Sequence, residues 1–308
     1  MKNYVTVKQL IDLANLEILG GNGGIENHIT MDEITFPWME FAGYFTYFDP
    51  NRLILIGSKE LMYLTNLDKD VAYIRVEEIC KQQPPAIVFS KNVDVLPFFI
   101  ELGNRYNVPI LKSEFRTTPL NSKLFGFLRD RLAERKSVHG VLLDINGVGT
   151  LIIGKSGIGK SETALELVKR GHQLVADDRV DIYEKEVGIL IGAAPELIAQ
   201  YLEVRGVGII NVIDMFGAGA YRETKKIFLV IEIEKWDENK IYDRLGLDKQ
   251  YETYFHTDVP KITIPVLPGR NTAVLIEAAA MNAKLKYLGN NAAVELTNKI
   301  SRRARGEE

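Results

Sequence analysis

The sequence is poor in the features that mark secreted, membrane and nucleic-acid-binding proteins. It has a single cysteine, Cys80, which excludes an intrachain disulfide and is typical of a reducing compartment. No apolar run approaches the roughly 18 residues that a membrane span needs, and the first residues lack the apolar core of a signal peptide. The net charge of −3 favours no basic face of the kind that binds nucleic acid. These absences predict a soluble cytoplasmic protein without membrane or nucleic-acid partners.

The chain of 308 residues is long enough for two domains with separate cores. Residues 1–127 alternate short apolar runs with turn signals, and we expect strands over 53–56, 86–89 and 108–111 and helices over 5–16 and 96–102. This order predicts a small N-terminal α/β domain with some parallel strand pairing. A helix over 121–134 ends in charged residues and is the expected connection, so residues 128–308 are expected to form the second domain.

In the second half, strands are expected over 138–145 and 150–153, joined by Asn146-Gly147, because both residues tolerate the positive φ angles of a tight hairpin. A helix over 161–170 should end at Gly171. Strands over 174–176 and 227–233 and a helix over 272–288 follow. We interpret the basic cluster at 302–305 as a frayed, solvated terminus.

The clearest motif is a phosphate-binding loop between the expected strand over 150–153 and the helix over 161–170. It fits the pattern G-x-x-x-x-G-K-[ST], in which backbone N–H groups and a helix N-terminus wrap a polyphosphate. Lys160 would reach the β- and γ-phosphates, and the Ser161 hydroxyl would bind Mg²⁺. The nucleotide-binding residues predicted by the motif are Gly154, Lys155, Ser156, Gly157, Ile158, Gly159, Lys160 and Ser161.

Two acids, Asp177 and Asp178, end the strand that follows this helix. In a βαβ unit that strand would lie beside the strand of the phosphate-binding loop, so its carboxylates would emerge at the phosphate end of the sheet. One acid could position Mg²⁺ while the other takes a proton from an attacking hydroxyl. The alternative is a pair of solvated turn acids, and the residues alone do not say which aspartate is the base.

Two further segments are ambiguous by themselves. Residues 203–211 carry an acid, an arginine and two glycines within an apolar stretch, which indicates either a functional loop or a bulged strand at an edge. Residues 265–271 contain a Pro-Gly turn and Arg270 before a helix, which indicates either a second anion site or an ordinary turn with Asn271 as the N-cap. Taken alone, His139 is a structural histidine and Arg244 a surface charge.

Together, these segments closely resemble the HPr kinase/phosphorylase family. Its members phosphorylate a regulatory serine of HPr, the phosphocarrier protein of the sugar phosphotransferase system, and also remove that phosphate. The resemblance is carried by residues 154–161, 177–179, 202–211 and 265–271, in matching order and spacing. The segment 202–211 is the specific part, because a phosphate-binding loop alone fits many functions.

The resemblance implies a fold and a reaction. The expected fold is α/β, with a small N-terminal α/β domain of regulatory or assembly role and a C-terminal P-loop kinase domain like that of phosphoenolpyruvate carboxykinase. The implied phosphoryl donor is ATP, or alternatively pyrophosphate, with Mg²⁺; inorganic phosphate attacks in the reverse direction and yields pyrophosphate. The family also implies HPr as partner, a homohexamer, regulation by metabolites such as fructose 1,6-bisphosphate and inorganic phosphate, and control of carbon catabolite repression.

The resemblance further implies roles for single residues. It makes four residues catalytic, with Asp178 accepting the proton in phosphorylation and donating it in the reverse direction, and Arg244 contacting the transferred phosphoryl group. The implied catalytic residues are His139, Lys160, Asp178 and Arg244. It assigns Mg²⁺ to Ser161 and Glu203. The loop tied chiefly to dephosphorylation comprises Pro265, Val266, Leu267, Pro268, Gly269 and Arg270.

Two other classes of protein share part of this pattern. A small-molecule kinase or a phosphoenolpyruvate-carboxykinase-like enzyme would share the phosphate-binding loop and the acids. A non-catalytic nucleotide switch would bind ATP without transferring phosphate to a protein. The segment 202–211 counts against both alternatives.

Overall fold

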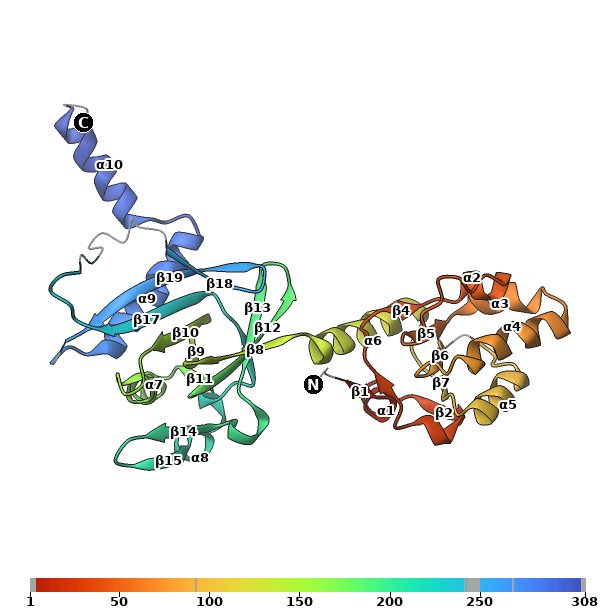
Figure 1. The fold of residues 1–308 in the computed structure, drawn as a ribbon. Helices are drawn as coiled ribbons and strands as arrows, with labels where there is room; N and C mark the ends of the chain where they lie inside the picture. Colours follow the sequence, from red (N-terminus) through yellow and green to blue (C-terminus); the bar gives the residue numbers. More distant parts are fainter. Residues whose placement is uncertain (1–3, 92, 241, 243–249, 268, 306–308) are drawn as a thin grey trace. The chain divides into compact units, whose positions relative to one another are not determined.

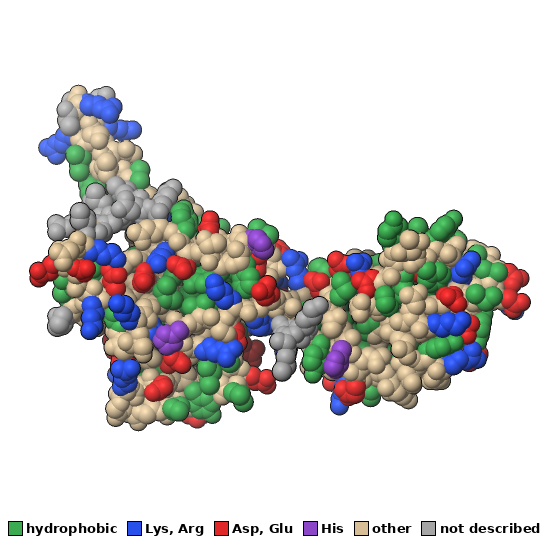
Figure 2. All heavy atoms as spheres, viewed as in Figure 1, with side chains coloured by type: hydrophobic (Ala, Val, Ile, Leu, Met, Phe, Trp, Pro, Cys, Tyr) green, Lys and Arg blue, Asp and Glu red, His purple; other side chains and the backbone are tan. Residues whose placement is uncertain are grey.

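The computed structural model describes residues 4–91, 93–240, 242, 250–267 and 269–305. The chain divides into two compact units, residues 1–133 and residues 134–308 (Figure 1). None of the helices within the described ranges is both long and apolar enough to cross a membrane. Figure 2 shows acidic and basic side chains interspersed on the viewed face of each unit.

Unit 1 is built on a five-stranded sheet in the order β2-β7-β6-β5-β4, in which β4 to β7 are parallel and β2 is antiparallel. Its strands are β1 (Val5–Thr6), β2 (Glu17–Gly20), β3 (His28–Ile29), β4 (Ile34–Thr35), β5 (Leu53–Ile56), β6 (Ile87–Phe89) and β7 (Ile110–Lys112). Its helices are α1 (Val7–Ala14), η1 (Asn22–Gly24), α2 (Trp38–Ala42), α3 (Ser58–Thr65), α4 (Lys69–Lys81), α5 (Pro97–Tyr106) and α6 (Thr117–Leu132). The expected N-terminal α/β fold with parallel pairing is confirmed.

Both faces of this sheet are buried. Successive side chains of a strand point to opposite faces, so each strand contributes to both core clusters. In β5, Ile54 and Ile56 pack with α2, α3, α4 and α5 in one core cluster. Leu53 and Leu55 pack with α1 and α6 in the other cluster. The helices that follow β5 and β6 therefore lie on one face of the sheet, while α6, which follows β7, lies on the opposite face.

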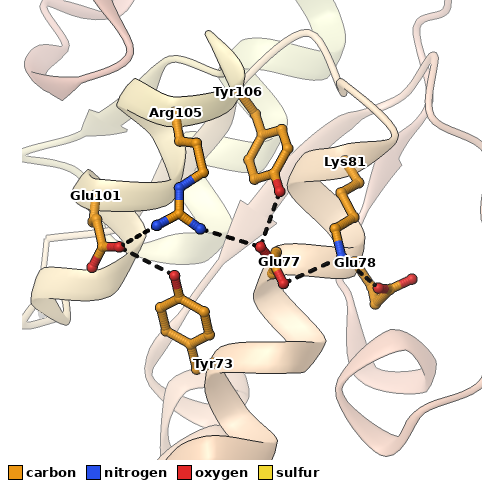
Figure 3. Close-up of polar contacts among 7 residues, drawn as sticks. All are labelled: Tyr73, Glu77, Glu78, Lys81, Glu101, Arg105 and Tyr106. Carbon is orange, nitrogen blue, oxygen red and sulfur yellow. Dashed lines mark hydrogen bonds and ion pairs between the residues drawn. The ribbon is translucent and has the colours of Figure 1, made fainter.

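Helices α4 and α5 are joined on their outer side by a polar network (Figure 3). Arg105 of α5 bridges Glu77 of α4 at 3.3 Å and Glu101 of its own helix at 2.8 Å. The Tyr106 hydroxyl donates to Glu77 at 2.9 Å, and this bond together with Lys81 holds the pKa of the Glu77 carboxyl below its ordinary value. Each exposed pair contributes little alone, so the network mainly fixes how the two helices lie against each other.

Unit 2 combines a six-stranded mixed sheet, ordered β11-β9-β10-β17-β19-β18, with a four-stranded sheet, ordered β16-β13-β12-β8, and the hairpin β14-β15. Its strands are β8 (Arg135–His139), β9 (Val141–Ile145), β10 (Val148–Gly154), β11 (Gln173–Ala176), β12 (Arg179–Glu186), β13 (Ile189–Ala193), β14 (Tyr201–Val204), β15 (Gly208–Asn211), β16 (Thr224–Lys226), β17 (Leu229–Lys235), β18 (Gln250–Tyr254) and β19 (Thr257–Val266). Its helices are α7 (Lys160–Lys169), η2 (Glu196–Ile198), α8 (Val212–Phe216), η3 (Ala218–Ala220), α9 (Thr272–Tyr287) and α10 (Ala292–Ala304).

The large sheet separates two core clusters of unit 2. On one face, Ile152 of β10 and Ile231 of β17 pack with residues of α7, α9 and the hairpin. On the other face, Leu151 of β10 packs against the four-stranded sheet. Strand β10 is thus covered on both sides. The loop that follows β10 therefore starts from a rigidly held strand.

The Asn146-Gly147 hairpin is confirmed: β9 and β10 pair antiparallel, and φ is 49° at Asn146 and 89° at Gly147. The expected single strand over 138–145 is wrong, because the chain changes sheet at Gly140. Strand β8 before it pairs with β12, whereas β9 after it pairs with β10. A Cβ atom at Gly140 would lie 2.6 Å from the Ile152 carbonyl oxygen, so only glycine fits this crossing.

Two other expectations about unit 2 are also wrong. Strand β11 does not lie beside β10, because the hairpin brings β9 between them. Both β11 and β10 run antiparallel to β9, so they still end at the same edge of the sheet. The basic cluster at the C-terminus is not frayed throughout: Arg302 and Arg303 lie in the last turn of α10, whose first turn is capped by the Asn291 side chain.

Candidate active site in unit 2

The phosphate-binding loop connects β10 to α7 and depends on glycines with positive φ. The angles are 152° at Gly154, 78° at Gly157 and 100° at Gly159, a region that other residues rarely adopt. Gly154 also lies so close to β17 that a Cβ atom would be 2.4 Å from the Ile233 carbonyl oxygen. The loop can therefore present backbone N–H groups at the N-terminus of α7, as anion binding requires.

Lys160, the first residue of α7, folds back over this loop. Its side chain is nearly buried, with 7% of the residue exposed, and its Nζ donates to the Gly154 carbonyl oxygen at 3.0 Å. Burial lowers the pKa of Lys160, while the nearby carboxylates of Asp178 and Asp177 oppose that shift. The Lys160 Nζ also lies 3.1 Å from Nε2 of His139, which enters the site from the end of β8.

His139 links Lys160 to Asp178. Because the ammonium group can only donate, Nε2 of His139 accepts and the ring proton resides on Nδ1. That nitrogen lies 3.0 Å from the Asp178 Oδ1 atom and 2.9 Å from its carbonyl oxygen. The hydrogen bonds thus run from Lys160 through His139 to the Asp178 carboxylate, and they orient that carboxylate.

The two adjacent aspartates have different environments. Asp178 has a φ of 63°, in the left-handed region that aspartate adopts more readily than most residues. The Asp178 side chain is 67% exposed, so a substrate can reach it. Asp177 is only 5% exposed and accepts from the Ser161 hydroxyl at 3.0 and 3.1 Å and from the Glu203 N–H at 3.1 Å. Asp178 is therefore the accessible acid of the pair, and Asp177 the buried acid that holds Ser161.

The segment 202–211 forms most of the hairpin β14-β15, which lies beside the phosphate-binding loop. Glu203 of β14 and Arg205 of the turn line the same cavity of about 150 Å³ as Lys160 and Asp178. Arg205 lies so close to the loop that a Cβ atom at Gly157 would be 2.9 Å from its Nη1 atom. The segment is therefore a hairpin over the phosphate-binding loop rather than a bulged strand in a sheet.

The cavity contains oxygen donors that suit a hard cation. The Ser161 hydroxyl and the side chains of Asp177 and Glu203 all line it. No group of three or more His, Cys, Asp or Glu side chains able to hold a metal was found among the described residues. Mg²⁺ at a nucleotide site normally uses only one or two protein oxygens besides water and phosphate, so the donor set fits Mg²⁺ bound together with a polyphosphate.

The structure brings eight of the eighteen predicted site residues into one cavity. His139, Ser156, Gly157, Gly159, Lys160, Ser161, Asp178 and Glu203 line the cavity. Arg244 and Pro268 lie outside the described residues. The described residues of the 265–270 loop do not line this cavity. Asn271 caps α9 by accepting from the Val274 N–H at 3.3 Å, so the turn before α9 serves at least as a helix N-cap.

Two lining residues, Glu162 and Arg205, have no role in the predicted site, and a third, Asp177, is predicted only as one of two acids whose roles the residues alone do not separate. The neighbouring acids at 177 and 178 were a usable signal, but nothing local shows that one is buried. Arg205 lies between β14 and β15, and only the fold of the hairpin brings it to the loop. Glu162 lies in the first turn of α7 and carries no distinguishing pattern.

Replacing Asp177 with asparagine should change how stability depends on pH. Burial raises the pKa of this carboxyl above its ordinary value of 3.8, against hydrogen bonds from Glu203 and Ser161 that lower it. The folded protein holds the proton more tightly than the unfolded chain, so the free energy of unfolding falls as pH rises from 3.8 through the raised pKa. Asparagine does not titrate, so the variant does not lose free energy of unfolding in this way. Its stability relative to wild type should therefore increase between about pH 4 and about pH 7. Chemical denaturation of both proteins at the two pH values measures this, and a difference independent of pH would contradict it.

The chain matches two family models, described as HPr Serine kinase N terminus over residues 5–128 and HPr Serine kinase C-terminal domain over residues 130–300. It is 49% identical to the HPr kinase/phosphorylase of Bacillus licheniformis and 48% identical to that of Bacillus subtilis, in each case over 297 residues that cover 96% of both chains. A solved structure, that of the HPr(Ser) kinase/phosphatase from Coxiella burnetii, is 38% identical, covers 50% of this chain and 93% of its own, and superposes with a TM-score of 0.46.

Proposed function

The chain belongs to the HPr serine kinase family, and on this premise we propose that it acts on HPr as a bifunctional kinase and phosphorylase with a single active site. The observation that carries the proposal is the chain of hydrogen bonds from Lys160 through His139 to Asp178, beside the phosphate-binding loop. Lys160 and the accessible Asp178 carboxylate line one cavity, which supports a role for the first in binding phosphate and for the second in taking a proton.

In the forward direction, the loop binds ATP through its phosphates and the Lys160 ammonium lies against the γ-phosphoryl group. The Asp178 carboxylate takes the proton of the HPr serine hydroxyl while the serine oxygen forms a bond to the γ-phosphorus and the bond to ADP breaks. His139 acts as a positioning residue, because its Nδ1–H holds the carboxylate. The protein supplies mainly position and charge, as is usual in phosphoryl transfer.

In the reverse direction, inorganic phosphate occupies the loop. One of its oxygens bonds to the phosphorus of phosphoserine, the bond to the serine oxygen breaks, and pyrophosphate leaves. Microscopic reversibility requires Asp178, now protonated, to give its proton to the serine oxygen. The same loop thus binds the β- and γ-phosphates of ATP in one direction and phosphate or pyrophosphate in the other, and pyrophosphate can serve as an alternative donor.

We assign Mg²⁺ to the Ser161 hydroxyl and the Glu203 carboxylate, with Asp177 accepting from Ser161 behind them. The ion would neutralise charge on the phosphate oxygens. Arg244 is assigned to the transferred phosphoryl group by the family resemblance alone, because it lies outside the described residues. The resemblance also supports a cytoplasmic homohexamer, control by metabolites, a regulatory or assembly role for the N-terminal domain, and a physiological role in carbon catabolite repression.

Transfer of label from γ-labelled ATP tests the proposal. Purified protein, HPr and Mg²⁺ should give labelled phosphoserine in HPr, and a panel of small-molecule acceptors should stay unlabelled. Labelling of a metabolite instead of HPr would favour a small-molecule kinase. ATP binding without transfer to any acceptor would favour a nucleotide switch.

Replacing Arg270 with alanine should impair phosphorolysis more than phosphorylation. The described Arg270 side chain is exposed and follows Gly269, whose φ of 84° turns the chain before α9. A guanidinium there can bind inorganic phosphate, which is a substrate of the reverse reaction only. Initial rates of both reactions on one preparation of the variant measure the effect, each direction serving as control for the other. Equal losses in the two directions would refute a direction-specific role.

A further inference from the structure

Unit 1 contains a cavity of about 520 Å³ that the proposed reaction does not use. It lies just beyond the carboxyl ends of three parallel strands: Glu60 follows β5, Ser90 follows β6 and Arg116 follows β7. The helices after β5 and β6 lie on one face of the sheet and α6 lies on the other, as the two core clusters show. Ligands of open parallel sheets usually lie outside the carboxyl ends of the strands.

The floor of the cavity carries buried polar groups that are incompletely paired. Glu60 is 5% exposed, and its Oε2 atom accepts from the Gly57 N–H at 2.9 Å. Its other oxygen forms no hydrogen bond or ion pair with a described residue and is not fully buried, so a ligand can reach it. Ser90 is 2% exposed and shares one hydrogen bond of 2.9 Å with the Thr117 hydroxyl, so one O–H of this pair has no acceptor in the described part of the chain. These polar atoms line the cavity and are open to a ligand that supplies the missing partners.

The rim of the cavity carries two cations. Lys59 and Arg116 both line it and are exposed. Within the described ranges, neither side chain forms an ion pair or a hydrogen bond. Two unpaired cations over hydroxyl groups attract a phosphate. The buried Glu60 carboxylate beneath them repels a bare anion and requires hydrogen-bond donors instead.

We propose that this cavity binds a small polyol phosphate. The phosphate group pairs with Lys59 and Arg116, and the hydroxyl groups of the polyol donate to Glu60. Neither half of such a ligand satisfies the site alone, because inorganic phosphate leaves Glu60 without a donor and a neutral polyol leaves the cations unpaired. The volume lies within the range typical of small-molecule sites. The site is separate from the phosphate-binding loop of unit 2.

Calorimetric titration of the full-length protein with glycerol 3-phosphate and ribose 5-phosphate tests the proposal, with inorganic phosphate and glycerol as the separate halves. The double variant Lys59→Ala/Arg116→Ala should weaken binding of glycerol 3-phosphate and of ribose 5-phosphate by at least about tenfold. The matched control Lys8→Ala/Lys69→Ala removes two exposed lysines of unit 1 outside the cavity and should bind as wild type does. Glu60→Gln should weaken the polyol phosphates but not inorganic phosphate, since glutamine can still cap Gly57.

A fourth variant, Lys160→Ala, separates this site from the phosphate-binding loop and should leave polyol phosphate binding intact. Three results would overturn the proposal: no binding of either polyol phosphate at millimolar concentration, unchanged binding in Lys59→Ala/Arg116→Ala, or loss of binding in Lys160→Ala. Since binding is read without HPr or ATP, failure here leaves the proposed kinase and phosphorylase reactions untouched.

Discussion

Replacement of Asp178 with asparagine is expected to slow both phosphorylation of HPr and phosphorolysis of phosphoserine-HPr by at least about 10²-fold, the usual size of a general acid–base contribution. The structure makes this a clean substitution. Asparagine tolerates the left-handed φ of 63° found at this position, and the side chain is largely exposed, so folding should not suffer. ATP binding should survive, because Asp178 does not belong to the phosphate-binding loop.

Asp181→Asn is the matched control. Asp181 lies on β12, three residues further along, and contacts Arg179 and Ser137 without lining the cavity. It should retain near-wild-type rates in both directions. Near-wild-type turnover of Asp178→Asn would remove Asp178 as the proton acceptor, and loss of one direction only would contradict a shared site.

Replacement of Lys160 with alanine is expected to reduce both reactions by about 10²- to 10³-fold, as loss of a preorganised charge-stabilising group does. Lys160 is the buried cation at the base of the loop, and its Nζ reaches both the Gly154 carbonyl oxygen and His139. The variant therefore loses a charge at the phosphates and the donor that sets the tautomer of His139. The KM for ATP should rise together with the fall in kcat.

Lys169→Ala, at the exposed end of the same helix, is the control for loss of a lysine from α7. Circular dichroism of both variants checks that α7 still folds. If Lys160→Ala kept the wild-type kcat and KM, the phosphate-binding loop would not be the nucleotide site.

The parts of the fold that the sequence predicts well are those governed by short-range rules. The glycines of residues 154–161 and the hairpin at Asn146-Gly147 require positive φ, and the structure has it at both places. The end of α7 at Gly171 follows from the same rule. Local backbone sterics decide these positions, so no knowledge of the tertiary fold is needed.

The parts that the sequence does not predict depend on contacts between distant segments. The continuous apolar pattern over 138–145 hides the change of sheet at Gly140, which only the close approach of Ile152 requires. The position of β9 between β10 and β11 is likewise a matter of topology. The different environments of Asp177 and Asp178 depend on a left-handed φ and on the Glu203 N–H, which is far away in sequence.

The cavity in unit 1 is the feature that the sequence predicts least, since no sequence motif indicates it. Its lining comes from the segments after four separate strands: Phe36 follows β4, and those after β5, β6 and β7 each contribute only one to three ordinary polar residues. The parallel order of β5, β6 and β7 brings these loops to one edge. Strand pairing, rather than any local pattern, creates the site.

The central claim is that one site transfers the phosphoryl group in both directions, with inorganic phosphate as the attacking group in the reverse reaction. The most direct measurement is the amount of pyrophosphate formed per serine of HPr freed, on addition of inorganic phosphate to phosphoserine-HPr made by the same protein. We expect one pyrophosphate for each serine freed and no reaction without added phosphate. Release of serine without added phosphate, yielding only inorganic phosphate, would show hydrolysis by water and contradict the claim.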